Sequence, residues 1–183
     1  MEIKELPLAG AKLILPKIFS DSRGFFLESY SEPRYHAAGI RERWVQDNHS
    51  RSVKGTLRGL HYQSAPGQAK LVRVTLGAIY DVLVDIRPES PTFGRSCGVQ
   101  IDSEQHAQVY VPVGFAHGFC VLSDVAEVQY KVSSPYDAAT ECAIRWNDPE
   151  LNVDWPIRDP VLSQRDQVSE SFADFKRRLG HRS

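Results

Sequence analysis

Four side chains that can move or stabilise protons lie in strand-like segments, three of them on faces that are otherwise apolar. They are His61, Lys70, His117 and Tyr130. Strand side chains alternate between two faces, so Lys70 leads the valine row of KLVRVTL and Tyr130 lies between two valines in EVQYKV. Burying a polar group without a partner costs roughly 1–3 kcal/mol. One such residue is more often a satisfied core group, but four together predict a polar cavity inside a small β-barrel.

These groups suit proton transfer next to a carbonyl. A histidine can remove an α-proton, a lysine can stabilise the charge that develops on the carbonyl oxygen, and a tyrosine can return a proton from the other side. This set predicts an epimerase or isomerase. Two arginines, Arg23 in DSRGFF and Arg58 in TLRGLHYQ, have the geometry that binds phosphate groups, although a solvated charge is the commoner interpretation of a single arginine after a turn.

Two other chemistries have weaker support. The six histidines include no H-x-H or H-x-x-x-H pair, which disfavours a metal site. The chain has no G-x-S-x-G motif, which disfavours nucleophilic hydrolysis. We therefore expect no metal or other cofactor.

The spacing of Arg58 and His61 raises a geometric question. They are three positions apart, so regular alternation would place them on opposite faces of a strand. Gly59 lies between them, and glycine readily carries a β-bulge. The sequence predicts either a bulge at Gly59 that turns both side chains inward, or an Arg58 that reaches phosphates at the cavity mouth while His61 points into the cavity.

Composition limits the partners and the compartment. The 183 residues include 22 basic and 23 acidic side chains, so no overall positive field attracts nucleic acid. No run of about 18 apolar residues and no signal-peptide pattern occurs, which predicts a soluble, cytoplasmic protein without a membrane segment. The three cysteines, Cys97, Cys120 and Cys142, form no C-x-x-C pair, which argues against a disulfide framework.

The elements that must position these groups are mainly strands. Short runs of Val, Ile, Leu, Tyr and Phe alternate with turn residues, the pattern of an all-β sandwich or barrel. The expected strands include 11–15, 25–30, 70–76, 79–87, 108–111, 119–122 and 127–132. Two peripheral helices are expected at 31–39 and 169–180. Without a repeat or a linker, residues 1–183 are expected to form a single domain.

Six ordered motifs support a more specific hypothesis. They are DSRGFF, VQDNHSRSVKGTLRGLHYQ, QAKLVRV, DVLVDIRPESPTFG, VPVGFAHGF and RWNDPELNVDWP, and they run from about residue 20 to residue 166. Together they resemble the dTDP-4-dehydrorhamnose 3,5-epimerases, metal-free cupins of nucleotide-sugar metabolism. The resemblance implies an antiparallel β-jelly roll, usually a homodimer. It also implies inversion of C3 and C5 of dTDP-4-keto-6-deoxy-D-glucose to give dTDP-4-keto-L-rhamnose, a step of dTDP-L-rhamnose biosynthesis.

The resemblance also implies a role for each matching residue. The catalytic base falls on His61, its orienting aspartate on Asp166, the acid on Tyr130 and the lysine at the C4 carbonyl on Lys70. The other substrate-binding positions fall on Arg23, Phe26, Glu28, Gln46, Asn48, Arg58, His117, Tyr136, Glu141 and Arg165. Among these, Phe26 is a candidate stacking surface, and we suggest Asp81 as a partner of His117.

Two positions depart from the family pattern. Family members often carry lysine where this chain has Arg165, which preserves a phosphate contact but changes its geometry. A family tyrosine pair is replaced by Pro135 and Tyr136, which keeps only the second aromatic ring.

Three alternatives share much of this pattern. An epimerase of another dTDP-deoxysugar pathway could act on C3 or C5 alone, and a ketoisomerase of the same fold could bind the same nucleotide. The RGLHYQ context argues against the ketoisomerase. A non-catalytic sugar-nucleotide-binding cupin would keep Arg23 and Arg58 but would not need Tyr130. Product analysis with the dTDP-keto sugar distinguishes them.

Overall fold

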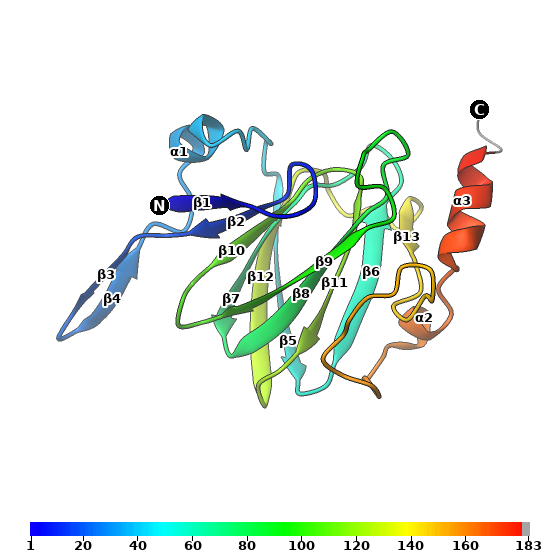
Figure 1. Cartoon of the computed structure of the whole chain (residues 1–183). Helices are drawn as coiled ribbons and strands as arrows, with labels where there is room; N and C mark the ends of the chain where they lie inside the picture. The colour runs from blue at the N-terminus through cyan, green and yellow to red at the C-terminus, as the bar shows by residue number, and fades with distance from the viewer. Residues whose placement is uncertain (181–183) are drawn as a thin grey trace.

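Two antiparallel β-sheets face each other in the computed structural model, which describes residues 1–180 (Figure 1). In spatial order, the first sheet contains β1 (Glu2–Glu5), β2 (Lys12–Leu15), β10 (Gln108–Val111), β7 (Lys70–Leu76), β12 (Val125–Val132) and β5 (Gln46–Val53). The second contains β13 (Glu141–Ala143), β6 (Leu57–Gln63), β11 (Phe115–Val121), β8 (Ala78–Asp85) and β9 (Ser96–Asp102). The expected all-β jelly roll is confirmed.

A hairpin and three short helices surround the sheets. The hairpin, β3 (Ile18–Asp21) with β4 (Gly24–Leu27), forms a sheet of its own and extends away from the barrel (Figure 1). The helices are α1 (Glu32–Ala37), α2 (Gln164–Gln167) and α3 (Phe172–Gly180). Both expected helices are confirmed, with shorter bounds. No helix among residues 1–180 is long and apolar enough to cross a membrane.

Three apolar clusters hold these layers together. The main core lies between the sheets and takes the inward residues of β7 to β12, such as Val72, Val109 and Val128. A second cluster joins Phe172 and Phe175 of α3 to the outer face of the second sheet. The third packs residues around α1 against the first sheet. Burial of apolar surface at about 25 cal/mol per Å² is the main stabilising contribution to such a fold.

Several boundaries differ from the expected ones. β4 ends at Leu27, before the charged and polar residues of 28–30, and β11 begins at Phe115, four positions earlier than expected. β5 was not among the expected strands, because its sequence QDNHSRSV lacks an apolar face. It pairs along its full length with β12, and that pairing defines it as a strand.

Of the two arrangements expected around Gly59, the structure contains the bulge. In the pairing of β6 with β11, His61 lies opposite His117 and Arg58 lies opposite Phe119. Two residues of β6, Gly59 and Leu60, therefore face the single position between His117 and Phe119. Gly59 has a φ of +135°, a backbone conformation that glycine adopts at little cost.

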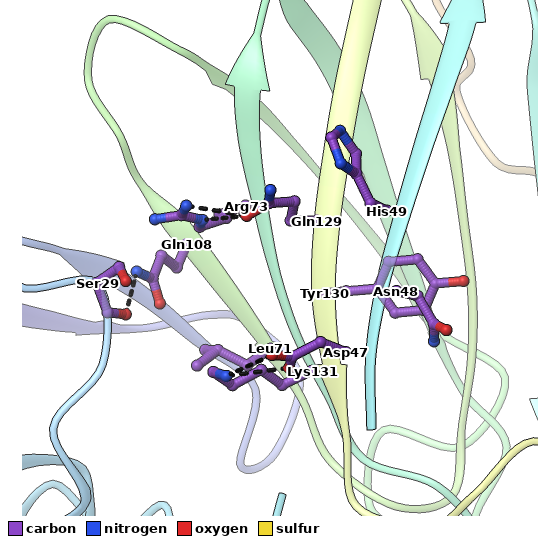
Figure 2. Close-up of a pocket in the computed structure, with 10 residues that line it drawn as sticks. All are labelled: Ser29, Asp47, Asn48, His49, Leu71, Arg73, Gln108, Gln129, Tyr130 and Lys131. Atoms are coloured by element: carbon purple, nitrogen blue, oxygen red, sulfur yellow. Dashed lines mark hydrogen bonds and ion pairs between the residues drawn. The ribbon is translucent and has the colours of Figure 1, made fainter. Parts of the chain in front are cut away.

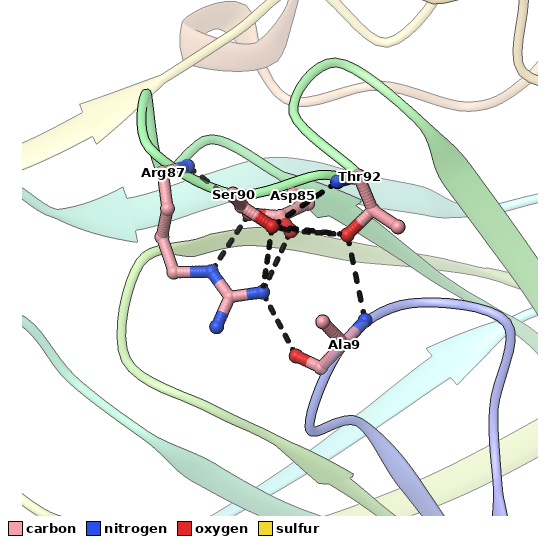
Figure 3. Close-up of polar contacts among 5 residues, drawn as sticks. All are labelled: Ala9, Asp85, Arg87, Ser90 and Thr92. Carbon is pink, nitrogen blue, oxygen red and sulfur yellow. Dashed lines mark hydrogen bonds and ion pairs between the residues drawn. The ribbon is translucent and has the colours of Figure 1, made fainter.

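A buried carboxylate ties the N-terminal loop to the second sheet (Figure 3). Asp85, at the end of β8, accepts hydrogen bonds from Arg87 Nη2 at 2.6 Å, Ser90 Oγ at 2.5 Å and Thr92 Oγ1 at 2.6 Å. Arg87 Nη2 also donates to the carbonyl of Ala9 at 2.8 Å. Burial alone raises the pKa of Asp85, but these bonds outweigh it and lower the pKa to about 2.

Candidate active site

A cavity of about 450 Å³ lies between the sheets. Its lining is Gln46, Asn48, Ser50, Arg58, His61, Tyr62, Gln63, Gln68, Lys70, His117, Phe119, Tyr130, Tyr136, Glu141 and Arg165. The structure thus brings together the four residues that the sequence suggested for proton transfer, His61, Lys70, His117 and Tyr130. Such a polar cavity between sheets suits a small polar ligand.

His61 contacts an aspartate that is remote in the sequence. Its Nε2 lies 2.6 Å from Oδ1 of Asp166, which belongs to α2 and is only 2% exposed. Burial raises the pKa of Asp166, but hydrogen bonding and charge from His61, with a hydrogen bond from Ser163, lower it below its ordinary value. Asp166 is therefore an anion that can orient the imidazole and stabilise its charged form.

Lys70 begins β7 and is buried, with 6% of its surface exposed. Burial lowers the pKa of its ammonium from the ordinary 10.5 to about 8, although the nearby Glu141 and Asp81 act in the opposite direction. The side chain is a concentrated positive charge in a poorly solvated wall of the cavity. Such a group stabilises negative charge on a bound ligand more strongly than an exposed lysine would.

His117 forms a second histidine–aspartate pair. Its Nε2 lies 2.8 Å from Oδ1 of Asp81, which is fully buried on the neighbouring strand β8. The suggested contact between these two residues is therefore present. The other oxygen, Asp81 Oδ2, has no hydrogen-bond partner among residues 1–180.

Tyr130 faces the cavity from β12, directly opposite Asn48 of β5. Burial raises the pKa of its phenol, and the nearby Arg58 partly offsets this effect. The hydroxyl is therefore a neutral proton donor over the physiological range. Arg58 reaches the same cavity from β6, where its Nε donates to Ser52 Oγ at 3.1 Å.

Several of the lining residues contact one another. Arg165 Nη1 donates to Glu141 Oε2 at 2.5 Å, and this bond together with the Arg165 charge lowers the pKa of Glu141 against the effect of burial. Gln46 accepts a hydrogen bond from the backbone N–H of Tyr136 at 3.0 Å and donates to Asn48 at 2.8 Å. Arg165 therefore forms an ion pair with Glu141 in the lining of the cavity.

Three predicted substrate-binding residues lie elsewhere. Arg23 is at the tip of the β3–β4 hairpin, with its side chain 87% exposed and paired with Asp21. Phe26 is 70% exposed on the same hairpin, and Glu28 follows it and pairs with Arg34. Within one chain, the structure does not bring these residues to the cavity around His61.

Several lining residues were not predicted from the sequence. Ser50, Tyr62, Gln63, Gln68 and Phe119 all contribute to the cavity wall. One signal was available in QDNHSRSV, where alternate residues share a strand face. That alternation places Ser50 beside the predicted Gln46 and Asn48.

A second, smaller cavity lies on the outer face of the first sheet (Figure 2). Figure 2 shows Arg73 and Gln108 on one side of β12, and Tyr130 with Asn48 on the other. The charged groups here are already paired, as in the 3.0 Å contact between Lys131 and Asp47. His61, Lys70 and His117 line the larger cavity and not this one, so the residues suited to proton transfer gather there.

Comparisons with known proteins identify the family of the chain. A family model described as dTDP-4-dehydrorhamnose 3,5-epimerase matches residues 5–174. The chain belongs to this family. A dTDP-4-dehydrorhamnose 3,5-epimerase of Pseudomonas aeruginosa is 48% identical over 95% of this chain and 97% of its own length. A dTDP-4-dehydrorhamnose 3-epimerase of Streptomyces niveus is 43% identical over 96% of this chain and 86% of its own.

A solved structure of the same family shares the fold. It is a dTDP-6-deoxy-D-glucose-3,5-epimerase of Legionella pneumophila in complex with dTDP-4-keto-L-rhamnose. The two chains superpose with a TM-score of 0.93 at 46% identity, over 97% of this chain and 96% of the other. The 3,5-epimerase family and its cupin-type barrel thus account for nearly the whole chain.

Proposed function

We infer that this protein is a dTDP-4-dehydrorhamnose 3,5-epimerase. It converts dTDP-4-keto-6-deoxy-D-glucose to dTDP-4-keto-L-rhamnose in dTDP-L-rhamnose biosynthesis. The observation that carries this conclusion is the 2.6 Å contact between His61 and the buried Asp166, in a cavity that also presents Lys70 and Tyr130. A non-catalytic binding protein would not need this combination of base, ammonium and phenol.

The reaction depends on the C4 ketone of the substrate. The protons on C3 and C5 are acidic because the ketone can take the resulting negative charge as an enolate. His61 removes each proton through the ring nitrogen that Asp166 does not bind, and Lys70 stabilises the enolate oxygen. Tyr130 then donates a proton to the opposite face of the carbon. One set of residues serves both carbons if the sugar ring adjusts between the two steps.

Proton exchange with solvent tests this mechanism. Substrate incubated with the protein in D2O takes up deuterium at both C3 and C5, as followed by NMR, and His61→Asn abolishes the uptake. His36→Asn is the matched control, because His36 lies on α1 and does not line the cavity. Label at one carbon only would identify a mono-epimerase like the Streptomyces niveus relative. Undiminished exchange in His61→Asn would refute the assigned base.

We also propose that the active form is a homodimer in which each β3–β4 hairpin reaches the partner's cavity. The hairpin extends from the barrel and exposes Phe19, Phe25 and Phe26 at 52%, 59% and 70% (Figure 1). Three neighbouring exposed aromatic rings indicate a surface that another molecule covers. A dimer would also explain why Arg23 lies far from His61 within one chain. Light scattering coupled to size-exclusion chromatography measures the mass of the species in solution.

A further inference from the structure

The carboxylate of Asp166 is held by two side chains. Oδ1 contacts His61 at 2.6 Å, and Oδ2 accepts a hydrogen bond from the hydroxyl of Ser163 at 2.8 Å. The backbone N–H of Asp166 donates to the same Ser163 Oγ at 3.2 Å. Ser163 therefore caps α2 and holds the carboxylate of the residue three positions later.

This arrangement leaves Asp166 with one orientation. The neighbouring Arg165 is directed to Glu141 rather than to Asp166. Among residues 1–180, the hydrogen bonds to the Asp166 carboxylate come only from His61 and Ser163. Without the Ser163 hydroxyl, Oδ2 would have no protein donor and the carboxylate could rotate away from the imidazole.

We propose that Ser163 is a positioning residue of the epimerase, which fixes the Asp166 carboxylate so that Oδ1 faces His61. This proposal rests on the proposed function of His61 as the base. Ser163 itself does not line the cavity, so it acts through Asp166 and not on the substrate. Second-layer hydrogen bonds of this kind hold reacting groups within the narrow range of geometry that catalysis requires.

The chain contains a matched control for the experiment. Ser171 donates to Oδ2 of Asp174 at 2.5 Å and accepts from its backbone N–H at 3.1 Å, the same pair of contacts at the start of α3. Asp174 pairs with Arg177, and neither Ser171 nor Asp174 lines the cavity. Ser171→Ala therefore removes an equivalent helix cap without touching the His61 pair.

The experiment compares steady-state kinetics of wild type, Ser163→Ala, Ser163→Thr and Ser171→Ala. Ser163→Ala should lower kcat about tenfold with little change in KM, because the base is misplaced while the binding surface is intact. Ser163→Thr keeps the hydroxyl and should restore most of kcat. Ser171→Ala should match wild type in both constants.

The pH profile gives a readout that a purely structural role would not move. The Ser163 hydrogen bond helps to lower the pKa of Asp166, so its loss raises that pKa. Because Asp166 shares a hydrogen bond with His61, the acid limb of kcat/KM should move in Ser163→Ala and stay in place in Ser171→Ala.

Two results would overturn the proposal. One is a wild-type kcat and acid limb in Ser163→Ala, and the other is an equal loss of kcat in Ser163→Ala and Ser171→Ala. The His61→Asn variant separates this failure from failure of the proposed function. If His61→Asn loses deuterium exchange while Ser163→Ala behaves as wild type, only the positioning role is wrong. If His61→Asn retains exchange, the assignment of the base itself is wrong.

Discussion

Gly59 of β6 and Gly118 of β11 pack backbone against backbone. A Cβ atom built on Gly59 would lie 2.5 Å from the Cα of Gly118, well inside any normal contact. This close approach lies between the Arg58–Phe119 and His61–His117 pairs. The bulge that directs Arg58 and His61 into one cavity therefore requires the absence of a side chain at both glycines.

Gly59→Ala should be strongly destabilising. It adds a clash with backbone atoms to an unfavourable φ of +135°, and we expect a loss of about 2–4 kcal/mol in the free energy of unfolding. Urea denaturation measures the change. Gly39→Ala is the control, because Gly39 has a φ of +82° but no atom within 4 Å of its Cβ position, and should cost about 1–2 kcal/mol. Equal losses in the two variants would contradict the role of the Gly118 contact.

The pH dependence of catalysis should reflect Lys70. Its pKa is lowered to about 8 by burial, and only the charged form stabilises an enolate, so kcat/KM should fall as pH rises through about 8. The pKa of Tyr130 is raised by burial, so its phenol stays protonated in this range. Lys70→Met should lower kcat by about 10²–10³ and remove this alkaline limb. A limb that persists unchanged in Lys70→Met would exclude Lys70 as its source.

The Asp85 network should stabilise the fold in a pH-dependent way. Because the folded pKa is depressed to about 2, the stabilisation is present above the ordinary pKa of 3.8 and is lost as pH falls from about 4 to about 2. Asp85→Asn should cost about 2–3 kcal/mol in urea denaturation at pH 7. The difference in unfolding free energy between Asp85→Asn and wild type should be smaller at pH 3 than at pH 7. A gap that does not change with pH would mean that the carboxylate charge is not what stabilises this loop.

Mixing two inactive variants tests the crossed hairpins. His61→Asn removes the base and Arg23→Ala removes a hairpin contact, so each alone should be poorly active. In a mixed dimer, the subunit with intact His61 receives an intact Arg23 from its partner, and about a quarter of the wild-type activity should return. A mixture of His61→Asn with Asp166→Asn is the control. Each change impairs the base of the subunit that carries it, so neither cavity of a mixed dimer is complete and no activity should return. No recovery with Arg23→Ala would contradict the shared site.

The sequence predicted the β-barrel well because most strands carry an alternating apolar face. Lys70, His117 and Tyr130 could be assigned to the interior for the same reason. β5 could not be predicted in this way, because both of its faces are polar. Its outer residues instead pair with charged neighbours, as Arg51 does with Glu127 at 2.8 Å.

The contact of Asp166 with His61 could not be predicted from the local sequence pattern. It is 105 residues from His61, and the four-residue helix that carries it is too short to show a helical period. Only the resemblance to the epimerase family suggested the pair. The separation of Arg23 from the cavity could not be predicted either. Alternation assigns a side chain to a face within one strand, but it does not predict how far a hairpin extends from the barrel.

The order of elements along the chain has a consequence for biosynthesis. Every strand of the two sheets precedes Ser163 and Asp166 in the sequence, so the ribosome makes all of these strands before the segment that carries Asp166. During synthesis at about 5–20 residues per second, the strands are available for pairing before that segment exists. On the proposed mechanism, a nascent chain that has paired its strands is still chemically inert, and it gains activity only when the segment with Arg165 and Asp166 docks.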